Sequence, residues 1–192
     1  MLKGPVRSSA LPYAQLDHLI LIFYNMKKVF SIFIAGLLSI ALAFNASAIE
    51  DPDPVGTLTV GAHASFVPGV GTNLFGDYVL VDSWWKGHFT VGGQASFSVV
   101  KYGTYSDTNI CLVPRATYGL NITPSFEVHA GLMTGLGYYS AGLSDSHASG
   151  IHVVYAEILG CRYFLNERFG LSAEVNYANL MPYFNLGVAL KF

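Results

Sequence analysis

The last nine residues of the chain, 184–192, alternate between apolar side chains and small or polar ones, and the chain ends on Phe192. Successive side chains of a β-strand point to opposite faces, so the apolar positions of this segment share one face. They are Phe184, Leu186, Val188, Leu190 and Phe192. The pattern predicts a strand with one apolar and one polar face.

The same two-residue period recurs throughout the chain after residue 48, where no helical period is found. In 125–138, for example, apolar side chains from Phe126 to Tyr138 alternate with Glu127, His129 and mostly small residues. The alternation predicts eight strands, at 56–66, 77–85, 89–100, 108–119, 125–138, 151–164, 170–178 and 182–192.

The predicted connections are of two kinds. Tight turns are expected at 85–87, 121–124 and 166–168, where Asn, Gly and Pro occur. Longer loops are expected at 67–76 and 139–150, which are rich in Gly, Ser and Asp. Short turns at one end and longer loops at the other are typical of membrane β-barrels.

The start of the chain has the three parts of a secretory signal peptide. Two lysines follow Met26, an apolar run covers 29–44, and Ala46-Ser47-Ala48 forms a small-residue cleavage site. We therefore predict a signal peptide over 26–48, with 1–25 as a doubtful upstream extension.

A transmembrane helix over 19–44 is the alternative for this segment. Lys27 and Lys28 interrupt that apolar run, and the part that remains is short for a helix that spans a membrane. With the signal peptide removed, residues 49–192 form one predicted domain.

The composition narrows the class of protein. Only 11 % of the residues are charged, against about 25 % in a typical soluble domain. Residues 49–192 contain six Lys and Arg and eleven Asp and Glu, so nothing indicates a nucleic-acid partner. A soluble barrel needs a charged outer surface, and this chain has too few charged residues to form one.

The polar faces of the predicted strands carry a small set of ionisable side chains, and two arrangements could accommodate them. A soluble, lipocalin-like barrel would bury its apolar face around a ligand and expose the polar face. A membrane barrel inverts this, and its narrow lumen would hold the polar set as a charge-paired network. We favour the inverted arrangement, with a lumen network of Arg115, Glu127, His129, Arg162, Glu174 and Lys191.

The signal peptide, the alternation, the turn spacing and the final aromatic residue together resemble the small eight-stranded outer-membrane barrels of the OmpA/OmpX type. The resemblance implies an all-β fold: an eight-stranded antiparallel up-and-down transmembrane β-barrel, preceded by a signal peptide. It also implies that Phe192 is part of the signal read by the barrel-assembly machinery. A monomer in contact with outer-membrane lipid and lipopolysaccharide is expected.

The expected function is structural, or an interaction at the cell surface, without catalysis. A lipid-modifying enzyme is the alternative, because Glu127 and His129 share the lumen face with Ser96 and Ser98. A lipid substrate would lie on the outer surface instead, so an interior network is expected for these groups. We predict no cofactor and no metal.

Two residues fit the pattern poorly. Glu157 has the parity of the apolar face, which would place a carboxylate against lipid unless a β-bulge turns it inward or it lies at the headgroup level. Pro114 lacks a backbone N–H and interrupts the fourth predicted strand, which indicates a second bulge.

Overall fold

A computed structural model of the 192-residue chain describes residues 51–102, 105–142 and 147–192. The predicted signal peptide, 26–48, and the extension, 1–25, lie outside the described residues and stay predictions. Among the described residues, no helix is long and apolar enough to cross a membrane.

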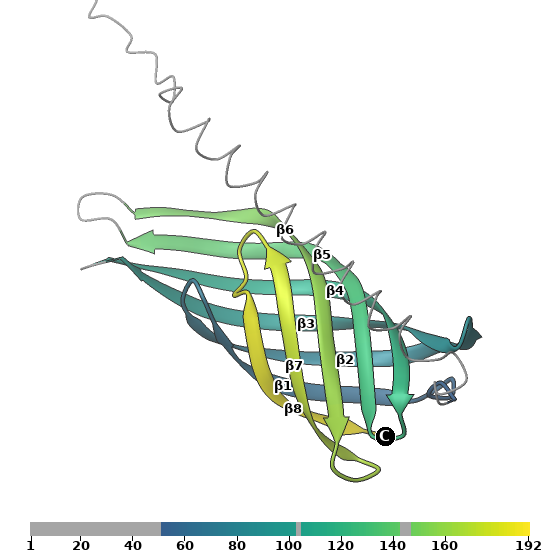
Figure 1. Cartoon of the computed structure of the whole chain (residues 1–192). Coiled ribbons are helices and arrows are strands. Elements are labelled where there is room, and N and C mark those ends of the chain that lie inside the picture. The colour runs from purple at the N-terminus through teal and green to yellow at the C-terminus, as the bar shows by residue number, and fades with distance from the viewer. Residues whose placement is uncertain (1–50, 103–104, 143–146) are drawn as a thin grey trace, which may run out of the picture. The chain divides into compact units, whose positions relative to one another are not determined.

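Eight antiparallel strands form a closed barrel in chain order, and the last strand pairs with the first (Figure 1). The predicted all-β, eight-stranded antiparallel up-and-down barrel is confirmed. The strands are β1 (Leu58–Phe66), β2 (Val70–Trp84), β3 (Gly87–Tyr102), β4 (Tyr105–Thr123), β5 (Phe126–Gly142), β6 (His147–Phe164), β7 (Phe169–Ala178) and β8 (Phe184–Lys191).

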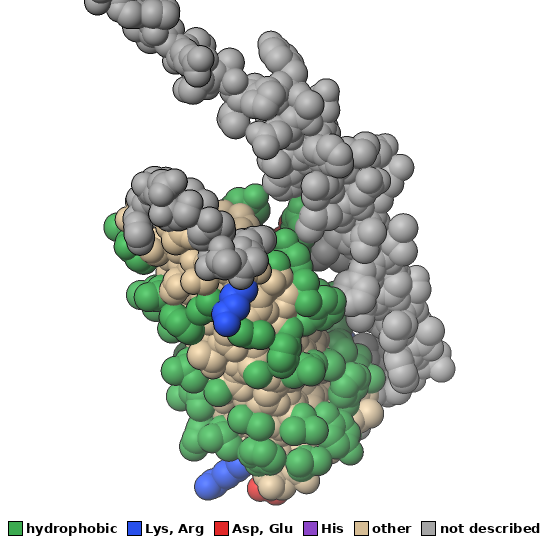
Figure 2. Space-filling model, turned by 90° about the vertical axis from the view of Figure 1, so that its left-hand side faces the viewer, with side chains coloured by type: hydrophobic (Ala, Val, Ile, Leu, Met, Phe, Trp, Pro, Cys, Tyr) green, Lys and Arg blue, Asp and Glu red, His purple; other side chains and the backbone are tan. Residues whose placement is uncertain are grey.

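The alternation along each strand decides which side chains face outward. In β4, Leu112 is 69 % exposed, whereas the next residue, Val113, is 1 % exposed. In β5, Leu132 is exposed and Met133 is buried in the lumen. The predicted faces of β3, β5, β7 and β8 all agree with this arrangement. Hydrophobic side chains are spread over the outer face in view, among backbone and other uncharged side chains, and charged side chains are few (Figure 2).

The predicted extents of both long loops are wrong, although residues 143–146 lie outside the described part of the chain. The segment 67–76 is mostly strand, because β2 begins at Val70 and pairs with β1 up to Phe66. Most of 139–150 is also strand, because β5 continues to Gly142 and β6 begins at His147. Small and polar residues suggested loops there, but they continue the two-residue period of the neighbouring strands.

The barrel rim is uneven, since β3 to β6 continue beyond the ends of the other strands (Figure 1). Pairing of β6 with β7 stops at Ala156 and Ala178, whereas pairing of β6 with β5 continues to His147. We call residues 100–102, 105–110, 137–142 and 147–155 the projecting wall.

The side chain of Asn179 covers the point where β6 loses β7. Its Oδ1 accepts a hydrogen bond from the Tyr155 N–H at 3.2 Å, and its Nδ2 donates to the Val153 carbonyl at 2.9 Å. The amide thus takes the place of the next peptide group of β7. It ends the sheet at this edge without leaving those two backbone groups unpaired.

Neither predicted bulge is present. Glu157 pairs in regular register with Leu132 and Tyr177 and faces outward, next to the end of the β6–β7 ladder. Pro114 pairs with Gly93 in register; the β4–β5 pairing lapses beside it and resumes without a shift. A missing N–H therefore weakens the ladder at Pro114 without adding a residue to the strand.

Candidate functional site: the lumen and its mouth

Two arginines and three carboxylates meet in the middle of the lumen, and all five side chains are buried. Arg115 from β4 donates through Nη2 to Glu174 Oε1 at 2.8 Å, and its Nε lies 2.9 Å from Asp77 Oδ1. Arg162 from β6 donates to Asp77 and, at 3.1 Å, to Glu127 Oε1. Each carboxylate therefore faces a guanidinium, which offsets the cost of burying the charges.

His129 lies between two of these carboxylates. Its Nε2 is 3.1 Å from Glu174 Oε1, and its Nδ1 is 3.4 Å from Glu127 Oε1. Gly160 makes room for the ring, because a Cβ there would lie 2.5 Å from His129 Nε2. The structure thus brings together five of the six predicted lumen residues: Arg115, Glu127, His129, Arg162 and Glu174.

The sixth predicted lumen residue, Lys191, lies apart from this network, towards the end of the barrel with the tight turns. Its Nζ is 2.7 Å from Asp53 Oδ2 and 4.0 Å from the centre of the Phe164 ring. Asn121 holds the same carboxylate, donating through Nδ2 to Asp53 Oδ1 at 3.1 Å. The segment before β1 is thereby fixed across this end of the lumen.

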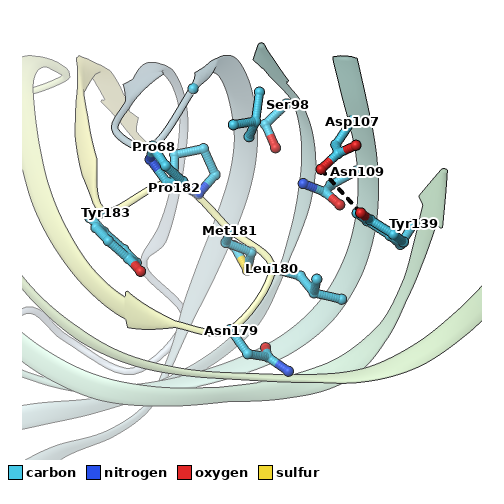
Figure 3. Close-up of a pocket in the computed structure, with 12 residues that line it drawn as sticks. Pro68, Ser98, Asp107, Asn109, Tyr139, Asn179, Leu180, Met181, Pro182 and Tyr183 are labelled. Atoms are coloured by element: carbon cyan, nitrogen blue, oxygen red, sulfur yellow. Dashed lines mark hydrogen bonds between the residues drawn. The ribbon is translucent and has the colours of Figure 1, made fainter. Parts of the chain in front are cut away.

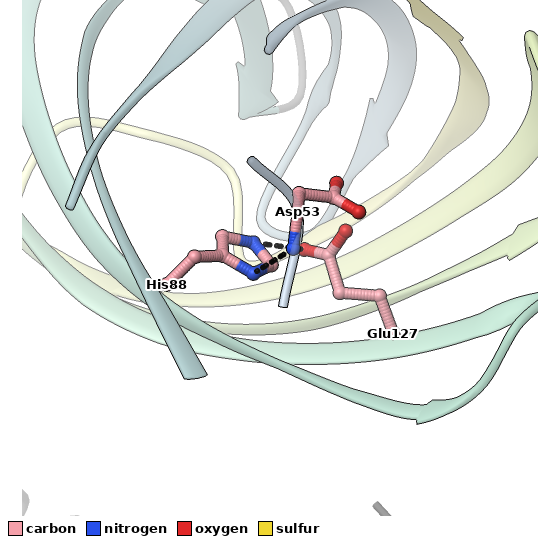
Figure 4. Close-up of side chains that lie close together, drawn as sticks. All are labelled: Asp53, His88 and Glu127. Atoms are coloured by element: carbon pink, nitrogen blue, oxygen red, sulfur yellow. Dashed lines mark hydrogen bonds and ion pairs between the residues drawn. The ribbon is translucent and has the colours of Figure 1, made fainter. Parts of the chain in front are cut away.

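Asp53, His88 and Glu127 lie close together there, and their possible ligand atoms are within 4.8 Å of one another (Figure 4). Each side chain already has a partner. Asp53 pairs with Lys191, Glu127 pairs with Arg162, and His88 Nδ1 accepts the Asp53 N–H. The two cationic side chains beside the cluster, Lys191 and Arg162, would repel a divalent cation. We therefore interpret the cluster as part of the floor of the lumen, by which we mean the charge-paired side chains around Asp53 at this end of the barrel.

An aromatic ring supports the network from one side. The guanidinium carbons of Arg115 and Arg162 lie 5.0 and 5.2 Å from the centre of the Phe75 ring, within the range of cation–π attraction. The His63 ring stacks on Phe75 at 4.8 Å between centroids. Gly61 is required beside it, because a Cβ would lie 2.4 Å from Phe75 Cε1.

An apolar layer closes the lumen between the charged network and the mouth. Its buried members come from β4, β5, β6, β7 and the β7–β8 connection: Cys111, Val113, Met133, Val154, Ala156, Ile158, Ala178 and Met181. The sequence prediction missed this layer. Val154 and Ile158 lie in a strand that is apolar on both faces, so alternation of polarity does not mark its inner side.

Asp77 and Phe75 were also missed, whereas Gln94 was expected on the polar face of its strand but not in the network. The first two lie in or beside 67–76, which was assigned to a loop, and Phe75 is a large apolar side chain on the polar face. The available signal was the two-residue spacing of the polar residues Asn73 and Asp77, which flank the outward Leu74 and Gly76; Phe75 itself breaks the alternation of polarity. Gln94 accepts from Arg115 Nη1 at 2.8 Å.

The suspected Ser-His-Glu set is not assembled. Both ring nitrogens of His129 face carboxylates, and Ser96 Oγ accepts a hydrogen bond from Gln94 at 3.1 Å. A different pair, His63 and Ser172, lies at 2.9 Å but is buried in the lumen. A lipid on the outer surface of the barrel has no access to either set.

A cavity of about 320 Å³ opens at the mouth, above the apolar layer (Figure 3). The projecting wall and the end of β3 line one side with Ser98, Asp107, Asn109 and Tyr139. The opposite side comes from the connections between β1 and β2 and between β7 and β8: Pro68, Gly69, Asn179, Leu180, Met181, Pro182 and Tyr183.

Solved structures with a similar fold are outer-membrane barrels. Ail, the attachment invasion locus protein of Yersinia pestis, is 15 % identical over 71 % of this chain and 97 % of that chain, with a TM-score of 0.52. The N-terminal β-barrel domain of Pseudomonas aeruginosa OprF is 18 % identical over 71 % of this chain and 98 % of that chain, with a TM-score of 0.48.

Neisserial surface protein A is 14 % identical over 70 % of this chain and 92 % of that chain, with a TM-score of 0.45. No protein-family model and no curated protein sequence matches the chain. The similarity to Ail, at a TM-score of 0.52, gives the class of fold: that of the small eight-stranded outer-membrane β-barrels, as the resemblance predicted.

Proposed function

We propose that the chain is a monomeric integral protein of the bacterial outer membrane with a structural or surface-interaction role and no catalytic activity. The observation that carries the proposal is the inverted distribution of polarity. Leu112 and Leu132 face outward from the middle of the barrel, whereas Arg115 and Arg162 are buried inside it. In water, that outer surface would be a large contiguous apolar patch.

A membrane environment would accommodate this distribution of polarity. A closed barrel pairs its backbone groups between strands and has no open edge within the hydrocarbon layer. An apolar outer surface then lies in lipid, and the ionised side chains lie in the lumen beside opposite charges. Outer membranes hold such barrels, and the aromatic side chains exposed near strand ends, such as Trp84 and Tyr138, suit the headgroup level.

The filled lumen supports a role other than general diffusion. The charged network, the apolar layer and the floor fixed by Asp53 lie one above another along the barrel. Eight strands leave room for little more than side chains. We expect no porin-like conductance in planar bilayers, and a steady open-pore conductance would contradict the closed lumen.

Heat-modifiable migration tests the proposal as a whole. The chain without residues 1–48 is refolded in detergent or lipid vesicles and run on a denaturing gel with and without boiling. A folded barrel is expected to migrate differently from the boiled sample. Expression of the full chain, with its predicted signal peptide, in a Gram-negative host is expected to place the barrel in the outer-membrane fraction. A folded polypeptide that is soluble without detergent would contradict the proposal.

Catalysis has its own test. The refolded protein is incubated with lipopolysaccharide, and the lipid A is examined by mass spectrometry. We expect no loss or transfer of an acyl chain, because the candidate groups lie paired within the lumen. Acyl-chain removal that disappears in His129→Ala would show that the chain is an enzyme.

A further inference from the structure

The lining of the mouth cavity includes a buried side-chain amide whose oxygen has no hydrogen-bond partner among the described residues. The amide belongs to Asn109, which is 7 % exposed. Its Nδ2 points into the cavity (Figure 3). A buried polar group without a partner costs about 1–3 kcal/mol, so an amide kept in this position is consistent with a ligand that pairs with it.

Other hydrogen-bonding groups converge on the same space. The Asp107 carboxylate accepts a hydrogen bond from the Tyr139 hydroxyl at 3.0 Å, and both side chains line the cavity. The Ser98 hydroxyl and the Tyr183 ring reach it from opposite sides (Figure 3). These groups can both donate and accept, as recognition of a ligand with several hydroxyl groups requires.

Most of the remaining lining is apolar; Asn179 is the exception, and its amide is bonded to the β6 backbone. Pro68, Leu180, Met181 and Pro182 lie across from the hydrogen-bonding groups. A pyranose ring has the matching shape, because its hydroxyl groups lie at the edge and its C–H groups form an apolar face. The cavity, at about 320 Å³, is at the lower end of the range for small-molecule sites, roughly 300–1,000 Å³.

The charge of the lining limits the ligand further. None of the described residues that line the cavity is Lys, Arg or His, and Asp107 is a carboxylate. A sulfate or phosphate group would be repelled by that carboxylate and would find no cationic partner. The lining therefore disfavours an anionic ligand.

A second cavity, of about 330 Å³, adjoins the first and shares Tyr139, Asn179 and Leu180 with it. His152 and Val153 complete its lining. It lies where β6 has lost its pairing with β7, so the space opens sideways between the projecting wall and the β7–β8 connection. A sugar in the first cavity could continue here into the next residue of a glycan.

We propose that the mouth cavity binds an uncharged terminal sugar residue of a surface glycan. This proposal rests on the proposed function, since the mouth meets such glycans only if the barrel lies in the outer membrane with the projecting wall outside the cell. Asn109 and Asp107 would hydrogen-bond the hydroxyl groups, and the apolar side would contact the C–H face.

NMR titration of the refolded chain without residues 1–48 tests the proposal, in dodecylphosphocholine because that detergent carries no sugar. The probes are glucose, galactose, N-acetylglucosamine and N-acetylglucosamine 6-sulfate. At least one uncharged sugar is expected to shift the side-chain amide signals of Asn109 in a saturable way. The sulfated sugar is expected to bind at least tenfold more weakly than its uncharged counterpart.

Asn109→Leu keeps the approximate size of the side chain and removes its hydrogen bonds, so it is expected to weaken binding at least tenfold. Binding to this variant and to Ser98→Ala is followed through backbone amide shifts. Ile110→Ala is the matched control, because Ile110 is the next residue and faces outward. If Asn109→Leu does not fold, Ser98→Ala takes its place, with a weakening of several-fold expected.

No saturable shift with any uncharged sugar would overturn the sugar site, as would unchanged affinity in the cavity variant or equal binding of the sulfated sugar. Heat-modifiable migration of the same sample separates the two proposals. A heat-modifiable barrel that binds no sugar refutes the site alone, whereas a folded chain that needs no detergent refutes the membrane barrel.

Discussion

Glu174 connects the two halves of the charged network, since one of its oxygens lies near both a guanidinium and an imidazole. Oε1 is 2.8 Å from Arg115 Nη2 and 3.1 Å from His129 Nε2. In a lumen without bulk water, removing such a carboxylate leaves its partners buried without a counter-charge. The identity of single side chains therefore matters more here than on the outer surface of the barrel.

We expect Glu174→Gln to lower the free energy of unfolding by about 3–5 kcal/mol, the range for breaking a buried ion pair by removal of one partner. Urea unfolding in lipid vesicles measures the change. Glu167→Gln is the control, because Glu167 is exposed in the tight turn between β6 and β7. Its substitution is expected to change the free energy of unfolding by no more than about 0.5 kcal/mol. Equal effects of the two substitutions would mean that the network contributes little to stability.

Gly160 permits the close approach of His129 and Glu174. Gly160→Ala would place a Cβ 2.5 Å from His129 Nε2 and 2.8 Å from Glu174 Cγ. We expect a loss of about 1–3 kcal/mol, as for other overpacked interiors. Gly93→Ala is the control, since its Cβ would meet nothing nearer than 3.8 Å. A tolerated Gly160→Ala would show that the ring has room to move.

Phe192 stays a predicted assembly signal. Its side chain is exposed, while its backbone exchanges two hydrogen bonds with Leu58, at 2.8 and 3.0 Å. Phe192→Ala keeps those bonds, so we expect refolding in detergent to be unchanged and the amount of assembled barrel in cells to fall several-fold. Equal losses in both assays would instead assign Phe192 a role in stability.

At the scale of the elements, the β2–β3 turn contains backbone strain. Trp85 and Lys86 have φ angles of 50° and 71°, in the left-handed region that side chains other than glycine rarely adopt. Trp84 and Gly87 pair across this two-residue turn, and the Tyr118 hydroxyl donates to the Trp84 and Trp85 carbonyls. These hydrogen bonds hold the turn in its strained conformation.

We expect Lys86→Gly to raise the free energy of unfolding by about 1 kcal/mol, because glycine adopts this conformation without the side-chain penalty. Lys86→Val should lower it, since a β-branched residue suits a positive φ poorly. Urea unfolding of the two variants tests this. A stabilising effect of valine would contradict the strained turn.

The strands show how far the sequence could predict the structure. Alternation was sufficient for β3, β5, β7 and β8, where outward apolar residues face inward polar ones. Alternation failed at Phe75, whose inward ring makes cation–π contacts with the two arginines. It also failed at Val154, because both faces of β6 are apolar there. Within the site, strand parity predicted the buried Glu127 and Arg162; the cavity at the mouth depends on the β7–β8 connection folding inward, which no local pattern indicates.

At the scale of the whole molecule, one physical arrangement explains composition, fold and proposed function. A barrel in the membrane, as proposed, needs few charged residues, because lipid would cover its outer surface and the ions pair inside. The projecting wall and the mouth cavity are then the parts that can meet molecules outside the membrane. The lumen stabilises the barrel, and the mouth is where interaction is proposed.

The orientation of the strands is measured most directly by nuclear Overhauser effects between lipid acyl chains and methyl groups of the refolded chain. Neighbouring residues on opposite faces give internal controls: Leu112 with Val113, and Leu132 with Met133. The account predicts lipid contacts at both leucines and none at Val113 or Met133. Acyl-chain contacts at Val113 and Met133 instead, or a well-folded spectrum in buffer without lipid, would contradict it.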